Sequence, residues 1–539
     1  MSLRTRTDAL LLAGFCAFLF FYGLGQFGLI GADEPRYAQV AREMLDHHDW
    51  ITPVLYGSPW LEKPPLYYWQ AMLVYSIFGV SDITARLPSA IDATLLVIAV
   101  YLFFRRFRSG VEVDAALITA SCAGVIGYAR AASTDMPLAA TFSVAMLAWW
   151  AWRECQKRIW LALFYACMAL GMLAKGPVAP FLAALIIVLS AAVAREWRLI
   201  ARTLWLPGIL LFCAVALPWY VAVQLRNPQF FHEFILEHNL ARFSTNLYHH
   251  TEPFWYYVPV TALALLPWIV FVVVAFARTV RTWWSERKSS SDSPDLEFDL
   301  SLFAVCWLVV PVVFFSISQS KLPGYILPAI PAGAVLLANY LRRQFESEQG
   351  LAKWISVVHA MVATALVVPA LLIAHIVTGH RVPSGRPLFI ALVVALVLFL
   401  AMMVTLFSRV GLRMLRFVTL IPIVLAVAAV LRLGAGSMDR ALSARPLAAE
   451  LAEMETHELP LAVCGTSREL EYGLAFYRNQ IITRCEYSAL PAQEFLLIAP
   501  PAWKSAVDEH TAGRRVTFLG HYAPQDVDYY WVAAGRKTP

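Results

Sequence analysis

Long apolar segments recur along most of this chain, and they limit the folds that it can adopt. A helix that crosses a membrane needs about 20 apolar residues, and the first such segment is 9–30. Further candidate segments are 83–104, 115–128, 137–152, 160–174, 178–194, 204–223, 255–276, 300–318, 325–341, 355–378, 388–407 and 417–433. Only 15% of the 539 residues are charged, whereas soluble domains carry about 25%. The sequence therefore predicts a mainly α-helical, polytopic membrane protein with about thirteen transmembrane helices.

Basic residues cluster between alternate pairs of these segments. The clusters lie at 105–108, 153–158, 195–202, 278–288, 342–343 and 409–416. The positive-inside rule places such clusters in the cytoplasm, together with the N-terminus, and an odd number of spans then places the C-terminal part outside. The net charge of +6 is spread over helix ends, which does not indicate a nucleic-acid partner. Segment 9–30 exceeds the roughly 7–15 apolar residues of a signal peptide, so we expect an uncleaved first helix.

The first polar segment, 31–82, carries two charged groups. Asp33 and Glu34 follow the first apolar segment directly, and the adjacent Pro35 suits a helix start with Asp33 as N-cap. The apolar spacing that follows predicts an amphipathic helix lying along the membrane surface. Glu62 and Lys63 precede two prolines, after which a second surface helix is expected.

Other outer segments also carry isolated polar side chains. Asp135, His238, Arg242, Lys321 and Tyr325 lie on such segments, and another has the string Ala-Lys-Gly-Pro at 174–177. Converging cations would bind a phosphate strongly, and carboxylates could bind a metal, orient a sugar or remove a proton. The alternative for each cation is a membrane anchor whose charged end reaches the interface.

The composition changes at about residue 437. Segments 461–465, 494–500, 516–522 and 529–534 are typical of strands, and 468–477 and 502–510 of helices. This alternation predicts a small α/β domain. Cys464 and Cys485 could form a disulfide outside the cytoplasm or remain two free thiols, because sequence does not give their separation. The other six cysteines lie in or beside apolar segments, and no spacing resembles a zinc or iron–sulfur site.

Several strings resemble those of GT-C glycosyltransferases, which use polyprenyl-phosphate sugar donors. They are DEPRYAQVAREM from 33, EKPPLYYW from 62, STDMP from 133, AKGP from 174, EHNLARF from 237 and SKLPGYILPAIP from 320. They are similar to the protein mannosyltransferase-related group, and within it most to the lipid A 4-amino-4-deoxy-L-arabinose transferases. The resemblance implies a GT-C domain over 1–436, with its first periplasmic loop at 31–82, and a periplasmic α/β domain over 437–539.

The resemblance also implies an activity. Such an inner-membrane enzyme of a Gram-negative bacterium moves 4-amino-4-deoxy-L-arabinose from undecaprenyl phosphate to a lipid A phosphate with inversion, which gives resistance to polymyxin. The expected partners are this donor, lipid A and membrane lipids, and we expect a monomer. Relatives with other sugars share the same strings, so the sugar, the acceptor phosphate and the oligomeric state stay open.

The resemblance assigns roles to individual residues. Asp33 is the main catalytic carboxylate and Asp135 the second, with Glu34 as a further catalytic candidate. The substrate-binding candidates are Lys63, Arg242 and Tyr325, which match donor-phosphate positions, together with Lys321 and Arg36. Glu62 and His238 match the region where relatives hold a divalent ion (Zn or Mg), and His249 and His250 are weaker candidates. One carboxylate and one histidine form a poor ligand set. A lipid A phosphate is already ionised, so with that acceptor we expect Asp33 to orient the acceptor or bind the sugar of the donor. With a hydroxyl acceptor, Asp33 would act as the base.

Three other functions compete with this one. The first is a related transferase with another sugar, or with a protein or glycan acceptor. The second is a transporter or lipid flippase, which would show repeated halves and ionisable residues in mid-membrane, and the sequence shows neither clearly. Asp92 is the one acidic residue well inside an apolar segment, with Arg86 as its expected partner. The third is a scaffold, which would not need charges on so many outer loops.

Overall fold

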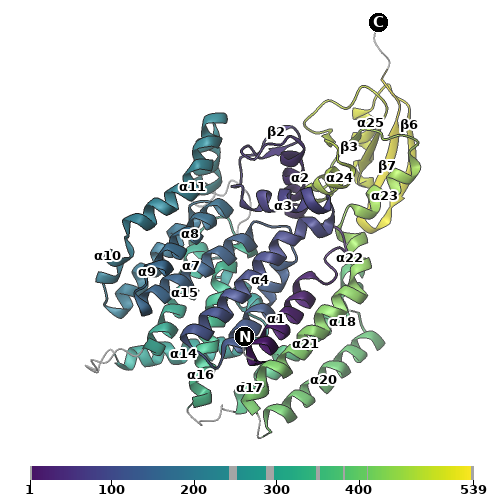
Figure 1. Ribbon diagram of the computed structural model, residues 1–539. Coiled ribbons are helices and arrows are strands. Elements are labelled where there is room, and N and C mark those ends of the chain that lie inside the picture. Colours follow the sequence, from purple (N-terminus) through teal and green to yellow (C-terminus); the bar gives the residue numbers. More distant parts are fainter. Residues whose placement is uncertain are drawn as a thin grey trace.

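The computed structural model of the protein describes residues 3–241, 252–286, 296–346, 353–379, 383–408 and 411–535. Helices form a large bundle, and a small sheet domain made by the C-terminal residues stands at one end of it (Figure 1). The helices of the bundle are α1 (Leu3–Cys16), η1 (Ala17–Phe21), α4 (Asp82–Phe107), α5 (Glu112–Ser121), α6 (Ala123–Ala129), α7 (Asp135–Cys155), α8 (Arg158–Lys175), α9 (Val178–Ala194), α10 (Arg198–Thr203), α11 (Leu206–Arg226), η2 (Phe231–Ala241), α13 (Tyr257–Ala264), α14 (Ile269–Glu286), α15 (Leu296–Ile317), η3 (Pro323–Ala329), α16 (Ile330–Glu346), α17 (Lys353–Ala365), α18 (Val367–Leu371), α19 (Ile373–Gly379), α20 (Arg386–Leu406), η4 (Gly411–Met414), α21 (Leu415–Ala429), η5 (Val430–Gly434) and α22 (Ala435–Leu442).

Eight helical segments in the described part of the chain are long and apolar enough to cross a membrane, and two bent helix pairs raise the number to ten if each pair is one span. The bends are 64° between α5 and α6 and 116° between α13 and α14. About thirteen spans were expected. The three remaining segments, 9–30, 137–152 and 178–194, are largely helical but fall outside this length and hydropathy criterion. The mainly α-helical membrane fold is confirmed.

The first apolar segment stops being helical at Phe21, although its composition predicted a helix to residue 30. Three arginines distant in sequence hydrogen-bond the carbonyl oxygens of the irregular chain that follows. Arg130 donates to Leu19, Tyr22 and Gly23, Arg86 donates to Leu24, Phe27 and Gly28, and Arg445 donates to Gly25 and Gln26. Buried backbone groups need such partners. The apolar composition could not reveal this break because the partners are tertiary.

Two surface helices follow this irregular chain, as predicted. Helix α2 covers Asp33–Asp46 and α3 covers Leu66–Phe78, with a two-stranded hairpin, β1 (Val54–Leu55) and β2 (Ser58–Pro59), between them. The N-cap of α2 is Ala32 and makes no side-chain cap hydrogen bond, so the prediction of Asp33 as N-cap was wrong. Asp33 is instead the first residue of the helix.

The C-terminal residues form the predicted α/β domain. Its helices are α23 (Arg445–Met454), α24 (Arg468–Arg478) and α25 (Lys504–His510), with short η6 (Pro501–Trp503) and η7 (Ala523–Gln525). Its strands are β3 (Leu461–Val463), β4 (Thr483–Arg484), β5 (Phe495–Ala499), β6 (Val516–Tyr522) and β7 (Val527–Val532), in the order β4-β3-β5-β7-β6. Strand β3 pairs in parallel with β4 and β5, and β7 pairs antiparallel with β5 and β6. Sequence indicated every strand except the two-residue β4.

Cys464 and Cys485 form a disulfide in this domain, with their Cα atoms 5.3 Å apart. The first follows β3 and the second follows β4, and these two strands are neighbours in the sheet. The sequence had left open whether the two thiols are joined. Strand pairing settles the question because it brings together two residues 21 positions apart.

Helix α2 lies between the bundle and the C-terminal domain (Figure 1). Its apolar side packs against α3 through Tyr37, whose ring contacts Tyr67 and Tyr68. The sequence predicted an amphipathic helix along the membrane surface and assigned no partner to its polar side. In the structure, Arg42 donates to the Phe476 carbonyl oxygen and Gln39 to Asn479, both in or directly after α24. The polar side chains of α2 therefore form an interdomain contact.

Candidate active site

Asp33 is the most accessible of the predicted carboxylates. Its side chain is 55% exposed at the first turn of α2, although the neighbouring Glu34 is buried. Arg36, one helical turn later, donates a hydrogen bond to Asp33 Oδ1 at 2.5 Å. An exposed carboxylate beside a cation can contact a substrate while its charge is balanced.

Glu34 is held by four hydrogen bonds. Oε1 accepts from Arg86 Nε and from the Ala132 amide, and Oε2 accepts from Arg86 Nη2 and from the Ile30 amide. Arg86 is 1% exposed and was expected to pair with Asp92, but that expectation was wrong: Asp92 accepts hydrogen bonds from Gln70. Glu34 was predicted as catalytic. With both oxygens engaged, Glu34 has a structural role, which we call a brace: its hydrogen bonds fix the start of α2 and so the position of Asp33.

Arg36 lies between two carboxylates and three aromatic rings. Its guanidinium bonds to Asp33 and is 3.8 Å from Glu62 Oε2. Burial alone would lower the pKa of Arg36, but the Tyr37 hydroxyl and the Glu62 and Asp33 carboxylates raise it above its usual value. Burial likewise raises the pKa of Tyr37, and the nearby Asp33 carboxylate raises it further. This part of the site therefore keeps a charged guanidinium and a protonated phenol beside Asp33.

Asp135 begins α7 and is surrounded by donors. It accepts hydrogen bonds from Lys175 and from the Ser133 hydroxyl, and its side chain is 15% exposed. Lys175 ends α8, and its Nζ lies 4.8 Å from the centre of the Tyr325 ring. Asp135 and Tyr325, predicted as site residues from distant segments, are therefore brought together by a lysine that the prediction did not include.

Gly324 and Tyr128 complete this group. A Cβ built on Gly324 would lie 2.7 Å from both the Asp135 carboxyl carbon and the Tyr128 hydroxyl, so the 323–325 turn packs against them. The Tyr128 hydroxyl and the Asp135 carboxyl group therefore lie on the same side of this turn.

The remaining predicted residues are placed less completely. Lys63 is half-buried directly before α3, and Lys321 is buried and donates to the Ser318 carbonyl oxygen at 2.6 Å. Lys321 therefore stabilises its own loop. Arg242, His249 and His250 lie outside the described residues, so the convergence of Lys63, Arg242 and Tyr325 on one phosphate stays a prediction.

The predicted metal ligands do not form a complete set. Within the described ranges, no group of three or more His, Cys, Asp or Glu side chains is arranged to hold a metal ion. Glu62 Oε2 lies 3.8 Å from the Arg36 guanidinium, and His238 lies on η2. The metal stays a prediction, and no reaction step is assigned to it.

A large apolar cavity reaches the base of the site. It has a volume of about 640 Å³ and is lined by apolar side chains of η5, α21, α18 and α6, with Glu34, Arg86 and Arg130 as the charged lining residues. Arg86 uses all five of its N–H donors in the bonds described above, and Arg130 makes three. The cavity therefore places an apolar space beside Glu34, the neighbour of Asp33 in the sequence.

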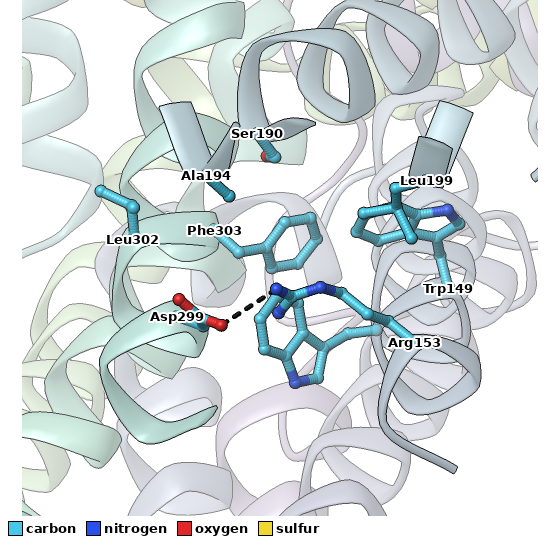
Figure 2. A pocket seen from close by; sticks show the side chains of 9 residues that line it. Trp149, Arg153, Ser190, Ala194, Leu199, Asp299, Leu302 and Phe303 are labelled. Atoms are coloured by element: carbon cyan, nitrogen blue, oxygen red, sulfur yellow. Dashed lines mark hydrogen bonds and ion pairs between the residues drawn. The ribbon is translucent and has the colours of Figure 1, made fainter. Parts of the chain in front are cut away.

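A second, much smaller cavity lies at the far end of α7 (Figure 2). Arg153 projects into it and pairs with Asp299 at 2.9 Å, with Trp149 and Phe303 nearby. Its volume is about 10 Å³, which is space for one water molecule. At 1.5 Å per residue, Arg153 is roughly 27 Å from Asp135 along the helix. This charge pair anchors helices and is no part of the site.

The chain is similar to known proteins in sequence and in fold. Residues 8–234 match the family described as dolichyl-phosphate-mannose-protein mannosyltransferase. The chain is 31% identical over 315 residues to the undecaprenyl phosphate-alpha-4-amino-4-deoxy-L-arabinose arabinosyl transferase of Photorhabdus laumondii, and 32% identical over 337 residues to one from Pseudomonas fluorescens. These alignments cover 57% and 60% of this chain, and 54% and 58% of the relatives, so the chain matches somewhat over half the length of each.

A solved structure extends the likeness to the whole chain. The crystal structure of ArnT from Cupriavidus metallidurans bound to undecaprenyl phosphate superimposes with a TM-score of 0.77 and 25% identity, over 98% of this chain and 99% of that one. The chain is therefore similar to ArnT in sequence and has the same fold. This bears out the predicted resemblance, and the ArnT-like fold includes the C-terminal domain as well as the bundle.

Sequence reasoning missed some residues of this candidate site. Lys175 stood in a quoted string, AKGP, but carried no role because a lysine at a helix end usually anchors the helix. Tyr128 had no signal beyond its place on an outer loop. Tyr472, whose ring lies 5.6 Å from the Arg36 guanidinium, belongs to a domain that was not expected to reach the site.

Proposed function

We propose that this protein is an integral-membrane glycosyltransferase that moves 4-amino-4-deoxy-L-arabinose from undecaprenyl phosphate to a phosphate group of lipid A. The observation that carries the proposal is the likeness, over the full chain, to an ArnT structure that holds undecaprenyl phosphate. The names of the arabinosyl transferase relatives support the sugar. The apolar cavity beside Glu34 supports a lipid-linked substrate.

In the proposed reaction, an oxygen of the lipid A phosphate attacks the anomeric carbon of the sugar. The bond between that carbon and the donor phosphate breaks, and undecaprenyl phosphate leaves with the electron pair. The configuration at the carbon inverts. Because the attacking oxygen is already ionised, the site has to position it and to stabilise the charge that develops on the leaving phosphate.

The residues divide this work by charge. Asp33, exposed and paired with Arg36, orients the acceptor or the amine of the sugar. Lys63 and Tyr325 bind the donor phosphate, together with Arg242. Lys175 holds Asp135 against Tyr325, and so fixes the second carboxylate relative to that phosphate. If the predicted Zn or Mg ion binds, Glu62 and His238 would hold it, and it would supply further positive charge.

The proposed setting is the inner membrane of a Gram-negative bacterium, with the site and the C-terminal domain in the periplasm and the protein acting as a monomer. Both lie at the same end of the bundle (Figure 1), and a disulfide in that domain suits an oxidising compartment. Adding a cationic sugar makes lipid A less negative. The expected cellular effect is resistance to polymyxin and other cationic peptides.

Mass spectrometry of lipid A tests the proposal. Cells that lack the protein should yield lipid A that is lighter by one aminopentose per modified phosphate, and the wild-type chain should restore that mass. If the wild-type chain restores a different sugar, the proposed donor is wrong. If lipid A is the same with and without the protein, the proposed acceptor is wrong. The match of residues 8–234 to a protein mannosyltransferase family favours a protein hydroxyl as second candidate acceptor, which glycoproteomics of the same cells would detect.

A further inference from the structure

The C-terminal domain supplies one wall around Arg36. The Arg36 guanidinium lies over three aromatic rings that come from three parts of the chain: Tyr37 at 5.2 Å, Trp60 at 5.4 Å and Tyr472 at 5.6 Å from the ring centres. Tyr37 belongs to α2 itself and Trp60 to the connection before α3. Tyr472 belongs to α24 and is 7% exposed. The domain therefore reaches the site through the ring of Tyr472.

Arg36 is the cation that sets the geometry of the first carboxylate group. It donates to Asp33 and lies 3.8 Å from Glu62. An arginine side chain has several rotatable bonds, so its guanidinium needs contacts to stay in one place. Cation–π interactions with the ring faces can hold the guanidinium in place, and they leave its N–H groups free to bond the carboxylates.

A neighbouring contact between the same two helices separates docking from positioning. Phe476 lies one turn after Tyr472 on α24, and its ring is 4.8 Å from the guanidinium of Arg42. Arg42 donates to the Phe476 carbonyl oxygen. Both pairs are an aromatic ring of α24 on an arginine of α2. Only the first arginine pairs with Asp33.

We propose that Tyr472 is a positioning residue for sugar transfer, which acts by holding Arg36 against Asp33 and Glu62. The inference rests on the proposed function, and it makes the C-terminal domain a part of the transfer site as well as a neighbour of it. The ring is what matters, because the Arg36 contact is made to the ring face. Tyr472→Phe should therefore keep activity, and Tyr472→Leu, which keeps apolar bulk but loses the ring, should lose it in part.

The test is a double-mutant cycle on the purified full-length protein with an aminoarabinosyl donor and lipid A. A cation–π contact sheltered from water is worth up to about 2 kcal/mol, so Tyr472→Leu should lower kcat by about 3- to 30-fold. In the Arg36→Gln background the same change should have no further effect. Phe476→Leu is the matched control: any loss that it causes should be the same in both backgrounds.

Several outcomes would overturn the proposal. The first is that Tyr472→Leu lowers kcat equally in the wild-type and Arg36→Gln backgrounds. The second is that Tyr472→Leu does not lower kcat in the wild-type background. The third is that Tyr472→Phe lowers kcat as much as Tyr472→Leu does. A cryo-electron microscopy structure of Tyr472→Leu gives a readout that needs no activity. A displaced Arg36 guanidinium supports the proposal, and an unmoved one refutes it. If the wild-type protein transfers no aminopentose, the proposed function fails, and the structure of the Tyr472→Leu variant still decides whether Tyr472 holds Arg36. If Arg36→Gln is too inactive for the cycle, that variant structure decides the question.

Discussion

Glu34 offers the sharpest test of how this site is built, because the sequence predicted a catalytic carboxylate and the structure presents a brace. We predict that Glu34→Ala destabilises the protein, with activity falling as the folded fraction falls. The change removes four hydrogen bonds and leaves Arg86, 1% exposed, without its ion-pair partner at 2.7 Å.

The magnitude follows from this burial. Breaking a buried ion pair by removing one partner costs about 3–5 kcal/mol, because the other charge stays buried. Here Arg86 keeps three carbonyl acceptors, Leu24, Phe27 and Gly28, which favours the lower end. Two backbone amides, of Ile30 and Ala132, also lose their acceptors. Each buried amide left without an acceptor costs about 1–3 kcal/mol, which raises the expected total destabilisation again.

Glu34→Gln should be almost as harmful as Glu34→Ala. Each carboxylate oxygen accepts two hydrogen bonds, one from Arg86 and one from a backbone amide. An amide group would place an NH₂ opposite two donors in either orientation. A catalytic carboxylate would behave differently, since its amide variant would lose transfer and keep its stability.

The assay is the apparent melting temperature of detergent-purified protein, followed by size-exclusion chromatography after heating, with transfer measured on the same samples. Asp508→Asn is the control: it removes an ion pair to Lys504 of the same 2.7 Å length, but with side chains 55% and 59% exposed. Exposed pairs contribute about 0–1 kcal/mol. If Glu34→Ala melts at the same temperature as Asp508→Asn, the brace is refuted.

Three further predictions address the rest of the molecule. Asp33→Asn should abolish aminopentose transfer without changing the melting temperature, because the exposed Asp33 carboxylate contributes little to the fold; near-normal lipid A modification would contradict its role. Lys175→Met should lower kcat roughly tenfold to a thousandfold, since it frees Asp135 and removes a cation beside Tyr325, and unchanged kinetics would exclude Lys175 from the site. Cys464→Ser should destabilise the C-terminal domain by about 3 kcal/mol, as expected for closing a loop of 21 residues; proteolysis of that domain measures this, and equal protease resistance would argue against it.

The sequence by itself determined the class of the fold. Most apolar segments of membrane length form helices here, because a helix satisfies its own backbone hydrogen bonds without water. Local patterns also gave α2, α3, most strands of the C-terminal domain and the candidate carboxylates Asp33 and Asp135. These features depend on residues a few positions apart, and sequence displays such residues directly.

The tertiary structure decided what those residues contact. Glu34 and Asp33 are adjacent in sequence, yet one is a buried brace and the other an exposed site residue, because Arg86, 52 positions after Glu34, holds only the first. The apolar run ends as a helix at Phe21 because three distant arginines bind the carbonyl oxygens that follow. Tyr472 reaches Arg36 across 436 positions through the docking of a separate domain. Such pairings depend on how whole elements pack, and no local pattern of charge or hydropathy records them.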